Sequence, residues 1–306
     1  MIKRKVSLIL VAGFLLLLGI LGYLYKVSNS DEHQLLEDIE RTIERHQEKI
    51  AETSKEMIEN EETVEETFVP EPIKEFFSEA FQLAKEIFQH QEIRIVALGD
   101  SLTQGVGDET DQGGYIGIIH DALHTNLPQP TAIIDNFGKR GQRTGQLLTR
   151  LHDETEQELE SSLELADIIL VTIGANDIME IFKQNILDLT MEPFLEEQPR
   201  YEQRLNDILN TLNHKNEHAK IYLLGFYNPF AEYFADIEEL DMIVNDWNEI
   251  NKTLAESYHF SEFIPIKDLF ETADDHLFAD DHFHPNRRGY ELIADRVLQY
   301  LIDHEG

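Results

Sequence analysis

The chain has 306 residues, with 60 acidic and 25 basic side chains, a formal net charge of −35 and no cysteine. Its length allows one substantial domain with accessory segments. The acidic excess disfavours nucleic-acid binding, which depends on cationic contacts with phosphate, and the absence of cysteine excludes disulfides, thiolate catalysis and cysteine-ligated metals.

Residues 1–26 are expected to form a single-pass membrane anchor. Lys3-Arg4-Lys5 precedes an uncharged, leucine-rich run from Val6 to Tyr25, which as a helix would span ~30 Å, the hydrocarbon thickness of a bilayer. The positive end should stay in the cytoplasm, so the rest of the chain is expected on the other side of the membrane. The alternative is a cleaved signal peptide and a secreted protein, with Ser28-Asn29-Ser30 near the cleavage site. Signal peptides usually have apolar runs of only ~7–15 residues, so the length favours an anchor.

Residues 27–71 are expected to form an acidic helical stalk. The segment 27–91 has 18 acidic and 6 basic residues, a net charge of −12. The apolar side chains that recur every seven residues are Leu36, Ile43, Ile50, Met57 and Val64. Their companion heptad positions are mostly polar, which favours a solvated stalk and leaves weak self-association through this stripe as the alternative.

The stalk should end at Pro70 and Pro72, because proline removes a backbone donor and restricts the residue before it. Residues 72–306 are then expected to form one domain. Residues 73–90 carry apolar side chains at helical spacing and predict an amphipathic helix that packs on this domain.

Strand-like and helix-like segments alternate from residue 92 onward. The expected strands are 93–98, 132–135, 167–173, 220–226 and 262–266, and the helix-like segments between them include 142–165, 200–217, 240–258 and 286–303. This alternation predicts a mostly parallel, five-stranded sheet with helices covering both faces.

Three polar segments follow the first three strands. Ser101 lies in Gly99-Asp100-Ser101-Leu102-Thr103, Gly141 follows the second strand and Asn176 follows the third. Sites of parallel sheets lie at the carboxyl ends of the strands, so these residues should meet at one edge. A serine or asparagine after a strand can also be a simple turn or cap residue.

Near the end of the chain, Asp281-His282-Phe283-His284-Pro285 places a carboxylate three residues before a histidine. A serine hydroxyl becomes a good nucleophile when a histidine takes its proton, and a carboxylate fixes the tautomer of that histidine. The spacing favours Asp281 as the partner of His284, with Asp280 as a solvated neighbour. Ser101, His284 and Asp281 are therefore the candidate catalytic triad.

The order of these four blocks resembles that of the SGNH hydrolases, also called the GDSL family of lipases and esterases. The resemblance covers roughly residues 92–304 and matches Ser101, Gly141, Asn176, and Asp281 with His284 to the four blocks. The resemblance implies a three-layer α/β/α sandwich of flavodoxin-like type around a mostly parallel five-stranded sheet. It also implies hydrolysis of an ester or related acyl bond without a metal or organic cofactor. The candidate oxyanion donors are Gly141, the Asn176 amide and the backbone N–H of Ser101.

One segment departs from the family pattern. The family usually has a small polar run after the glycine of the second block, whereas this chain has Gln142-Arg143-Thr144. Arg143 is long and charged, so the substrate entrance is expected to differ from the common form.

Three weaker signals have alternative interpretations. Asp281, His282 and His284 have the chemistry of zinc ligands, but a zinc site would need further ligands and would compete with the triad. Gly105-Val106-Gly107 lacks the lysine and spacing of a phosphate loop and indicates a turn beside Ser101. Tyr227-Asn228-Pro229 follows the fourth strand, either lining the site or only ending the strand.

These features predict a membrane-anchored, extracytoplasmic serine esterase that acts on a small-molecule, lipid or glycan ester. The contrasting hypothesis is a non-enzymatic cell-wall or membrane interaction protein that keeps a degenerate site. The complete set of five site residues favours the enzyme.

Overall fold

A computed structural model describes residues 93–124, 132–187, 189–230, 237–271 and 276–305. The chain divides into the units Met1–Phe68 and Val69–Gly306, and all described residues belong to the second unit. The expected membrane anchor, the stalk and the helix over 73–90 lie outside the described residues. Within the described part of the chain, none of the helices is both long and apolar enough to cross a bilayer.

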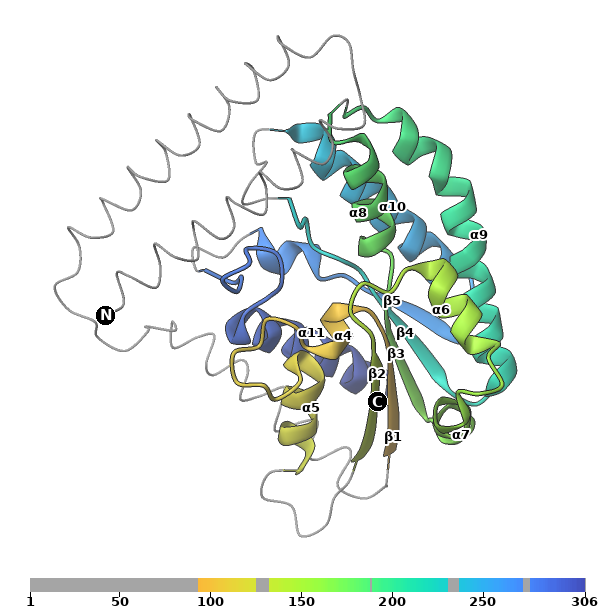
Figure 1. Cartoon of the computed structure of the whole chain (residues 1–306). Helices are drawn as coiled ribbons and strands as arrows, with labels where there is room; N and C mark the ends of the chain where they lie inside the picture. The colour runs from red at the N-terminus through yellow and green to blue at the C-terminus, as the bar shows by residue number, and fades with distance from the viewer. Residues whose placement is uncertain (1–92, 125–131, 188, 231–236, 272–275, 306) are drawn as a thin grey trace, which may run out of the picture. The chain divides into compact units, whose positions relative to one another are not determined.

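Five parallel strands form one sheet in the order β2-β1-β3-β4-β5 (Figure 1). The strands are β1 (Ile93–Gly99), β2 (Ala132–Gly138), β3 (Ile168–Thr172), β4 (Lys220–Leu224) and β5 (Ser261–Ile264). The apolar runs of β1, β3 and β4 are buried on both faces, as expected of a parallel sheet covered by helices, whereas the edge strand β2 is partly exposed. The predicted five-stranded parallel sheet is therefore confirmed.

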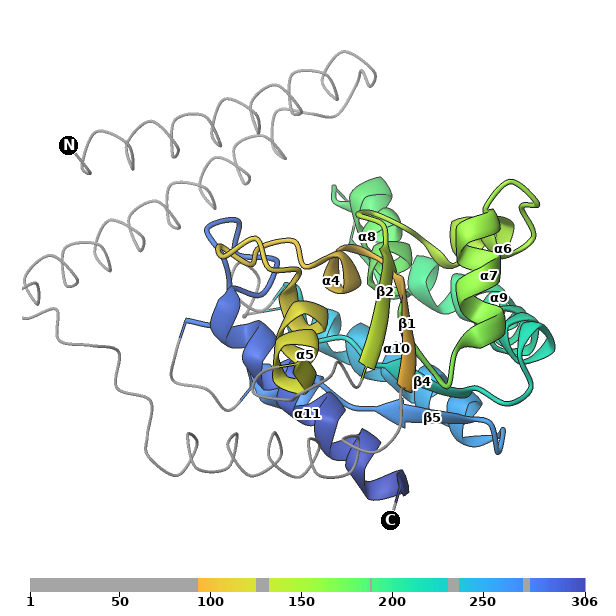
Figure 2. The same ribbon diagram turned by 90° about the horizontal axis from the view of Figure 1, so that it is seen from below.

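Helices cover both faces of this sheet, which gives the three layers seen in Figures 1 and 2. One face carries α6 (Thr144–Leu151), α7 (Gln157–Leu165), α8 (Ala175–Asn185), α9 (Glu192–Lys215) and α10 (Glu238–Glu256). The other carries α4 (Ser101–Gln104), α5 (Gly114–His124) and α11 (Arg287–Glu305), and a 3-10 helix, η1 (Lys267–Phe270), follows β5. Alternate strand residues serve the two cores: Val96 and Leu98 pack with the first group, Ile95 and Ala97 with the second.

Two helices differ from the prediction. The segment expected as one helix over 142–165 forms α6 and α7, because the Asp153 carboxylate accepts hydrogen bonds from Thr155 N (2.9 Å) and Oγ1 (2.7 Å) and closes a turn between them. Helix α9 begins at Glu192 rather than at residue 200 and continues through Pro199. Phe194, which is fully buried, anchors the turns before that proline to the core.

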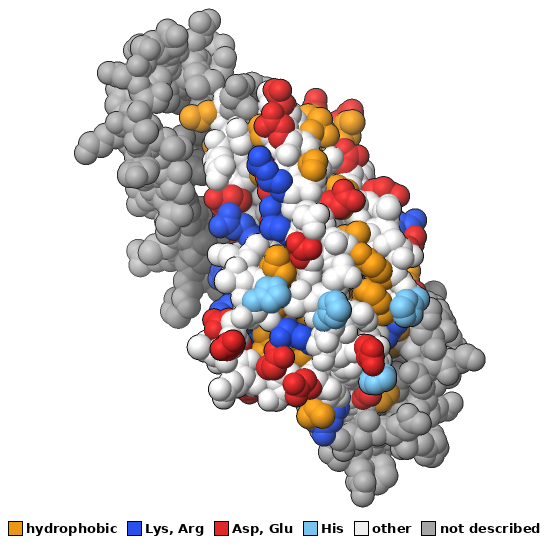
Figure 3. All heavy atoms as spheres, turned by 90° about the vertical axis from the view of Figure 1, so that its right-hand side faces the viewer, with side chains coloured by type: hydrophobic (Ala, Val, Ile, Leu, Met, Phe, Trp, Pro, Cys, Tyr) orange, Lys and Arg blue, Asp and Glu red, His pale blue; other side chains and the backbone are white. Residues whose placement is uncertain are grey.

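The surface on the side of α6, α7 and α9 is electrostatically mixed. Figure 3, which turns the right-hand side of Figure 1 toward the viewer, shows Asp and Glu side chains interspersed with Lys, Arg and apolar side chains. The acidic excess of the chain therefore does not form one continuous acidic field on this face.

Candidate active site

The register of the sheet places the carboxyl ends of β1, β2 and β3 side by side. Gly99, at the end of β1, is opposite both Gly138 of β2 and Thr172 of β3. Ser101 at the start of α4, Gly141 in the loop after β2 and Asn176 in the first turn of α8 all follow just beyond this line. The expected meeting of these segments at one sheet edge follows from this register.

Ser101 is the first residue of α4, a single helical turn. The carboxylate of Asp100 caps this turn by accepting a hydrogen bond from Leu102 N (3.0 Å), and Gly105 ends it in the left-handed conformation. Gly105-Val106-Gly107 is thus part of a turn beside Ser101. Gly107 has φ +98°, and a Cβ there would lie 2.8 Å from His284 Cβ, so this turn packs closely behind the histidine.

His284 connects the serine with the carboxylate. Its Nε2 lies 2.9 Å from Ser101 Oγ and its Nδ1 lies 2.6 Å from Asp281 Oδ2. Both ring nitrogens of His284 are thus engaged by side chains of the candidate triad. Among the described residues, no group of three or more His, Cys, Asp or Glu side chains is arranged so that it could hold a metal ion. The geometry matches a proton path from a hydroxyl to an imidazole that a carboxylate orients.

Asp281 also shapes its own loop. Its Oδ1 accepts from the backbone N–H groups of Phe283 (3.1 Å) and His284 (2.9 Å), which explains why a three-residue spacing brings its Oδ2 to the imidazole. Burial raises the pKa of Asp281, but the hydrogen bonds from His284 and Phe283 outweigh it and leave the pKa below its usual value. The carboxylate is thus ionised wherever a histidine can act as a base. Asp280 is exposed, as expected of a solvated neighbour.

The candidate oxyanion donors differ in their present partners. Within the described residues, the backbone N–H groups of Ser101 and Gly141 donate to no protein acceptor. Gly141 has φ +76°, a conformation that favours glycine, and the space where its Cβ would point is open. Asn176 Nδ2 donates to Gln142 O at 3.2 Å and to Asp100 Oδ2 at 3.3 Å. Both bonds are long, so an oxyanion can compete for this donor.

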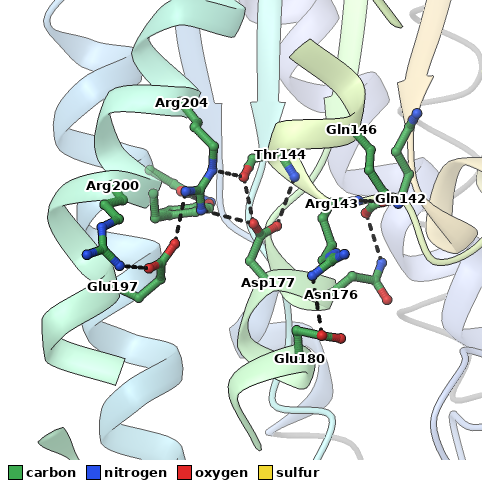
Figure 4. Close-up of polar contacts among 12 residues, drawn as sticks. Gln142, Arg143, Thr144, Gln146, Asn176, Asp177, Glu180, Glu197, Arg200 and Arg204 are labelled. Carbon is green, nitrogen blue, oxygen red and sulfur yellow. Dashed lines mark hydrogen bonds and ion pairs between the residues drawn. The ribbon is translucent and has the colours of Figure 1, made fainter. Parts of the chain in front are cut away.

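Gln142-Arg143-Thr144, the run after Gly141 that departs from the family pattern, contacts residues of α8 beside the site (Figure 4). The Gln142 carbonyl accepts from Asn176, and the Arg143 guanidinium pairs with Glu180 of α8 at 3.5 Å. Thr144 begins α6 and bonds to Asp177. Gln142, Arg143 and Thr144 therefore each link the loop after β2 to α8.

Apolar side chains surround a hollow beside Ser101. Its walls include Leu102, Ile173, Phe226, Tyr227, Pro229 and Phe283. Tyr227 also donates a hydrogen bond from its hydroxyl to Phe283 O (2.8 Å) and thereby anchors the loop that carries His284. The segment after β4 thus both lines the site and supports it.

Sequence reasoning missed two buried carboxylates, Asp100 and Asp177. Burial raises the pKa of Asp100 to about 6, while its bonds from Leu102 N and Thr172 Oγ1 favour the ionised form. Asp177 receives bonds from Thr144 and Arg204. Asp100 could have been found as a helix-capping aspartate that follows a strand. No sequence signal identified Asp177, because its partners are remote in the chain.

This combination of a three-layer α/β sandwich and a serine–histidine–aspartate chain at the strand ends defines the class of SGNH hydrolases. The chain belongs to the GDSL-like lipase/acylhydrolase family, whose model matches residues 97–292. It is an ester-hydrolysing enzyme of that family, as the resemblance of its four blocks predicted.

Individual relatives agree with this membership. The chain is 38% identical over 227 residues to the protein YpmR of Bacillus subtilis, covering 73% of this chain and 87% of that protein. It is 27% identical over 209 residues to the spore germination lipase LipC of Bacillus licheniformis, covering 67% of this chain and 94% of the lipase. The lipase Lip_vut3 from a goat rumen metagenome shares the fold, with a TM-score of 0.58, 24% identity and coverage of 67% of this chain and 95% of that one.

Proposed function

We propose that this enzyme is a membrane-anchored, extracytoplasmic serine esterase that works through an acyl-enzyme. Ser101 Oγ attacks the acyl carbonyl while His284 Nε2 takes the hydroxyl proton. Asp281 holds the imidazole and stabilises its protonated form. The observation that carries this proposal is the hydrogen-bonded chain from Ser101 Oγ through His284 to Asp281 Oδ2.

The charge that develops on the carbonyl oxygen is received by the N–H groups of Ser101 and Gly141 and by the Asn176 amide. Such a donor contributes about 3 kcal/mol when it is aimed at the transition state. The tetrahedral intermediate then expels the alcohol, which His284 protonates. Water, deprotonated by His284, attacks the acyl-serine carbon and releases the acid and the free serine.

The substrate we propose is a carboxylic ester whose acyl group lies in the apolar hollow beside Ser101. The walls formed by Ile173, Phe226 and Phe283 favour an apolar acyl group, and the lipase relative supports a lipid ester. A panel of p-nitrophenyl esters of increasing chain length, with an acetylated glycan as the alternative substrate, would identify the acyl group.

The direct test of the site is labelling with a fluorophosphonate, which phosphorylates an activated serine. The label should be found by mass spectrometry on the peptide that contains Ser101, and prior heat denaturation should prevent it. Failure of the folded protein to label at Ser101 would contradict the assignment of this serine as the nucleophile.

The membrane anchor leads to a prediction about fractionation. The run from Val6 to Tyr25 is long enough to span a bilayer, and Lys3-Arg4-Lys5 should hold its start in the cytoplasm. The full-length chain should therefore sediment with membranes and be shaved from intact cells by added protease, whereas residues 72–306 should remain soluble and hydrolyse esters. A mature protein in the medium that begins at Asp31 would show that the segment is a cleaved signal peptide.

A further inference from the structure

A partly buried polar cluster joins α9 to the starts of α6 and α8, next to Gly141 and Asn176 (Figure 4). It consists of Thr144, Asp177, Glu197 and Arg204, and we refer to it as the α9 clamp. The Arg204 guanidinium donates to three different residues: from Nε to Thr144 Oγ1 (2.7 Å), from Nη2 to Asp177 Oδ1 (3.2 Å) and from Nη1 to Glu197 Oε1 (2.9 Å). One side chain of α9 thereby binds the start of α6, the start of α8 and its own helix.

Asp177 forms the centre of this cluster. It lies in the first turn of α8, but its carboxylate caps α6: it accepts from Thr144 N at 3.0 Å and from Thr144 Oγ1 at 2.6 Å. A carboxylate at this place satisfies a free N–H and interacts favourably with the helix dipole. The Asp177 side chain is 6% exposed. Burial raises its pKa above the usual value, although the bonds from Thr144 and Arg204 offset part of this rise. A cation beside a buried carboxylate stabilises its ionised form, and Arg204 supplies one for Asp177.

The chain positions of these residues connect the clamp to the proposed oxyanion site. Asn176 immediately precedes Asp177, and Gly141 lies three residues before Thr144. The bonds between Thr144 and Asp177 therefore hold the Gly141 loop and the Asn176 side chain at a fixed distance. The bond from Asn176 Nδ2 to Gln142 O closes the same link on the side of the site.

We propose that Arg204 is a positioning residue for ester hydrolysis, acting through Thr144 and Asp177 to align Gly141 and Asn176. The proposal rests on the oxyanion role proposed above for these two residues. Arg204 itself lies on α9, which contributes none of the four sequence blocks. Its effect should fall on the transition state, because a donor displaced by about 1 Å no longer matches the oxyanion.

The kinetic test compares Arg204→Gln with Arg200→Gln in the full-length enzyme in detergent. Arg200 is the matched control because it lies one turn earlier on α9, bonds to the same Glu197 and is 76% exposed. Arg204→Gln should lower kcat about 10- to 100-fold with KM nearly unchanged, as expected for a misplaced transition-state donor. Arg200→Gln should stay within twofold of wild type.

A second variant is needed because Arg204→Gln leaves the Asp177 carboxylate without its cation. A loss of activity in that variant would not by itself distinguish unfolding from misalignment of the donors. Arg204→Lys keeps the charge but cannot reach all three acceptors, so it should fold and still lose kcat, by less than Arg204→Gln. In the double variant of Arg204→Lys with Asn176→Ala, the combined loss should be smaller than the product of the two single losses, because Arg204 acts in part through Asn176. Full kcat in Arg204→Lys, or a lowered melting temperature as its only change, would overturn the proposal.

Hydrogen–deuterium exchange provides a readout independent of activity. The segment 139–147 should exchange faster in Arg204→Lys than in wild type, and Arg200→Gln should match wild type. Unchanged exchange in this segment would contradict the positioning role even if the enzyme lost activity. A wild-type enzyme that neither hydrolyses esters nor labels at Ser101 would instead refute the proposed function, and with it the catalytic part of this inference.

Discussion

Ser101→Ala and His284→Ala should each lower kcat for ester hydrolysis by at least ~10³-fold while the fold remains intact. Ser101 Oγ and His284 Nε2 lie 2.9 Å apart, so the nucleophile and its base act as one unit. The double variant should consequently be little worse than either single variant. The measurement is steady-state hydrolysis of a p-nitrophenyl ester, with circular dichroism to check folding.

Two control comparisons make this test specific. Ser161→Ala removes a hydroxyl from the exposed surface of α7 and should leave kcat unchanged. Asp281→Asn should reduce activity strongly, whereas Asp280→Asn, on the exposed neighbour, should not. More than a tenth of wild-type activity in pure Ser101→Ala would mean that the nucleophile is a different residue.

Asn176→Ala should lower kcat by ~10²–10³-fold with KM nearly unchanged, since an oxyanion donor acts mainly in the transition state. Little stability should be lost, because the bonds of Asn176 Nδ2 to Gln142 O and Asp100 Oδ2 are 3.2 and 3.3 Å long and therefore weak. Steady-state kinetics over a range of substrate concentrations would separate the two constants.

The matched control is Asn185→Ala, at the far end of the same helix, where the amide donates a hydrogen bond to the backbone carbonyl of Ile181. This variant should keep wild-type kcat. If Asn176→Ala raised KM and left kcat unchanged, the amide would bind the ground-state substrate and the oxyanion assignment would be wrong.

Much of the site could be predicted because its residues are adjacent in sequence to recognisable strand ends. Ser101, Gly141 and Asn176 each follow an apolar run, and a parallel sheet must bring the ends of such runs to one edge. Asp281 and His284 are close enough in sequence for one loop to pair them. These five residues could therefore be selected as site candidates from their neighbours in the sequence.

The supporting residues could not be predicted in the same way. Asp177 caps a helix that begins 33 residues earlier in the chain, and Arg204 reaches Thr144 across 60 residues. No periodicity or spacing encodes such contacts. The break between α6 and α7 was also missed, because the Asp153–Thr155 turn competes with a helix whose apolar pattern continues past it.

The sequence by itself determined the alternation of strands and helices, and hence the parallel sheet, because buried parallel strands require continuous apolar runs. It also identified the candidate site residues that follow the strand ends. Only the tertiary structure decided how those residues are held: that Tyr227 fixes the His284 loop and that Arg204 ties the starts of α6 and α8 together. These contacts depend on where helices pack in three dimensions, and packing is a property of the whole fold rather than of any one segment.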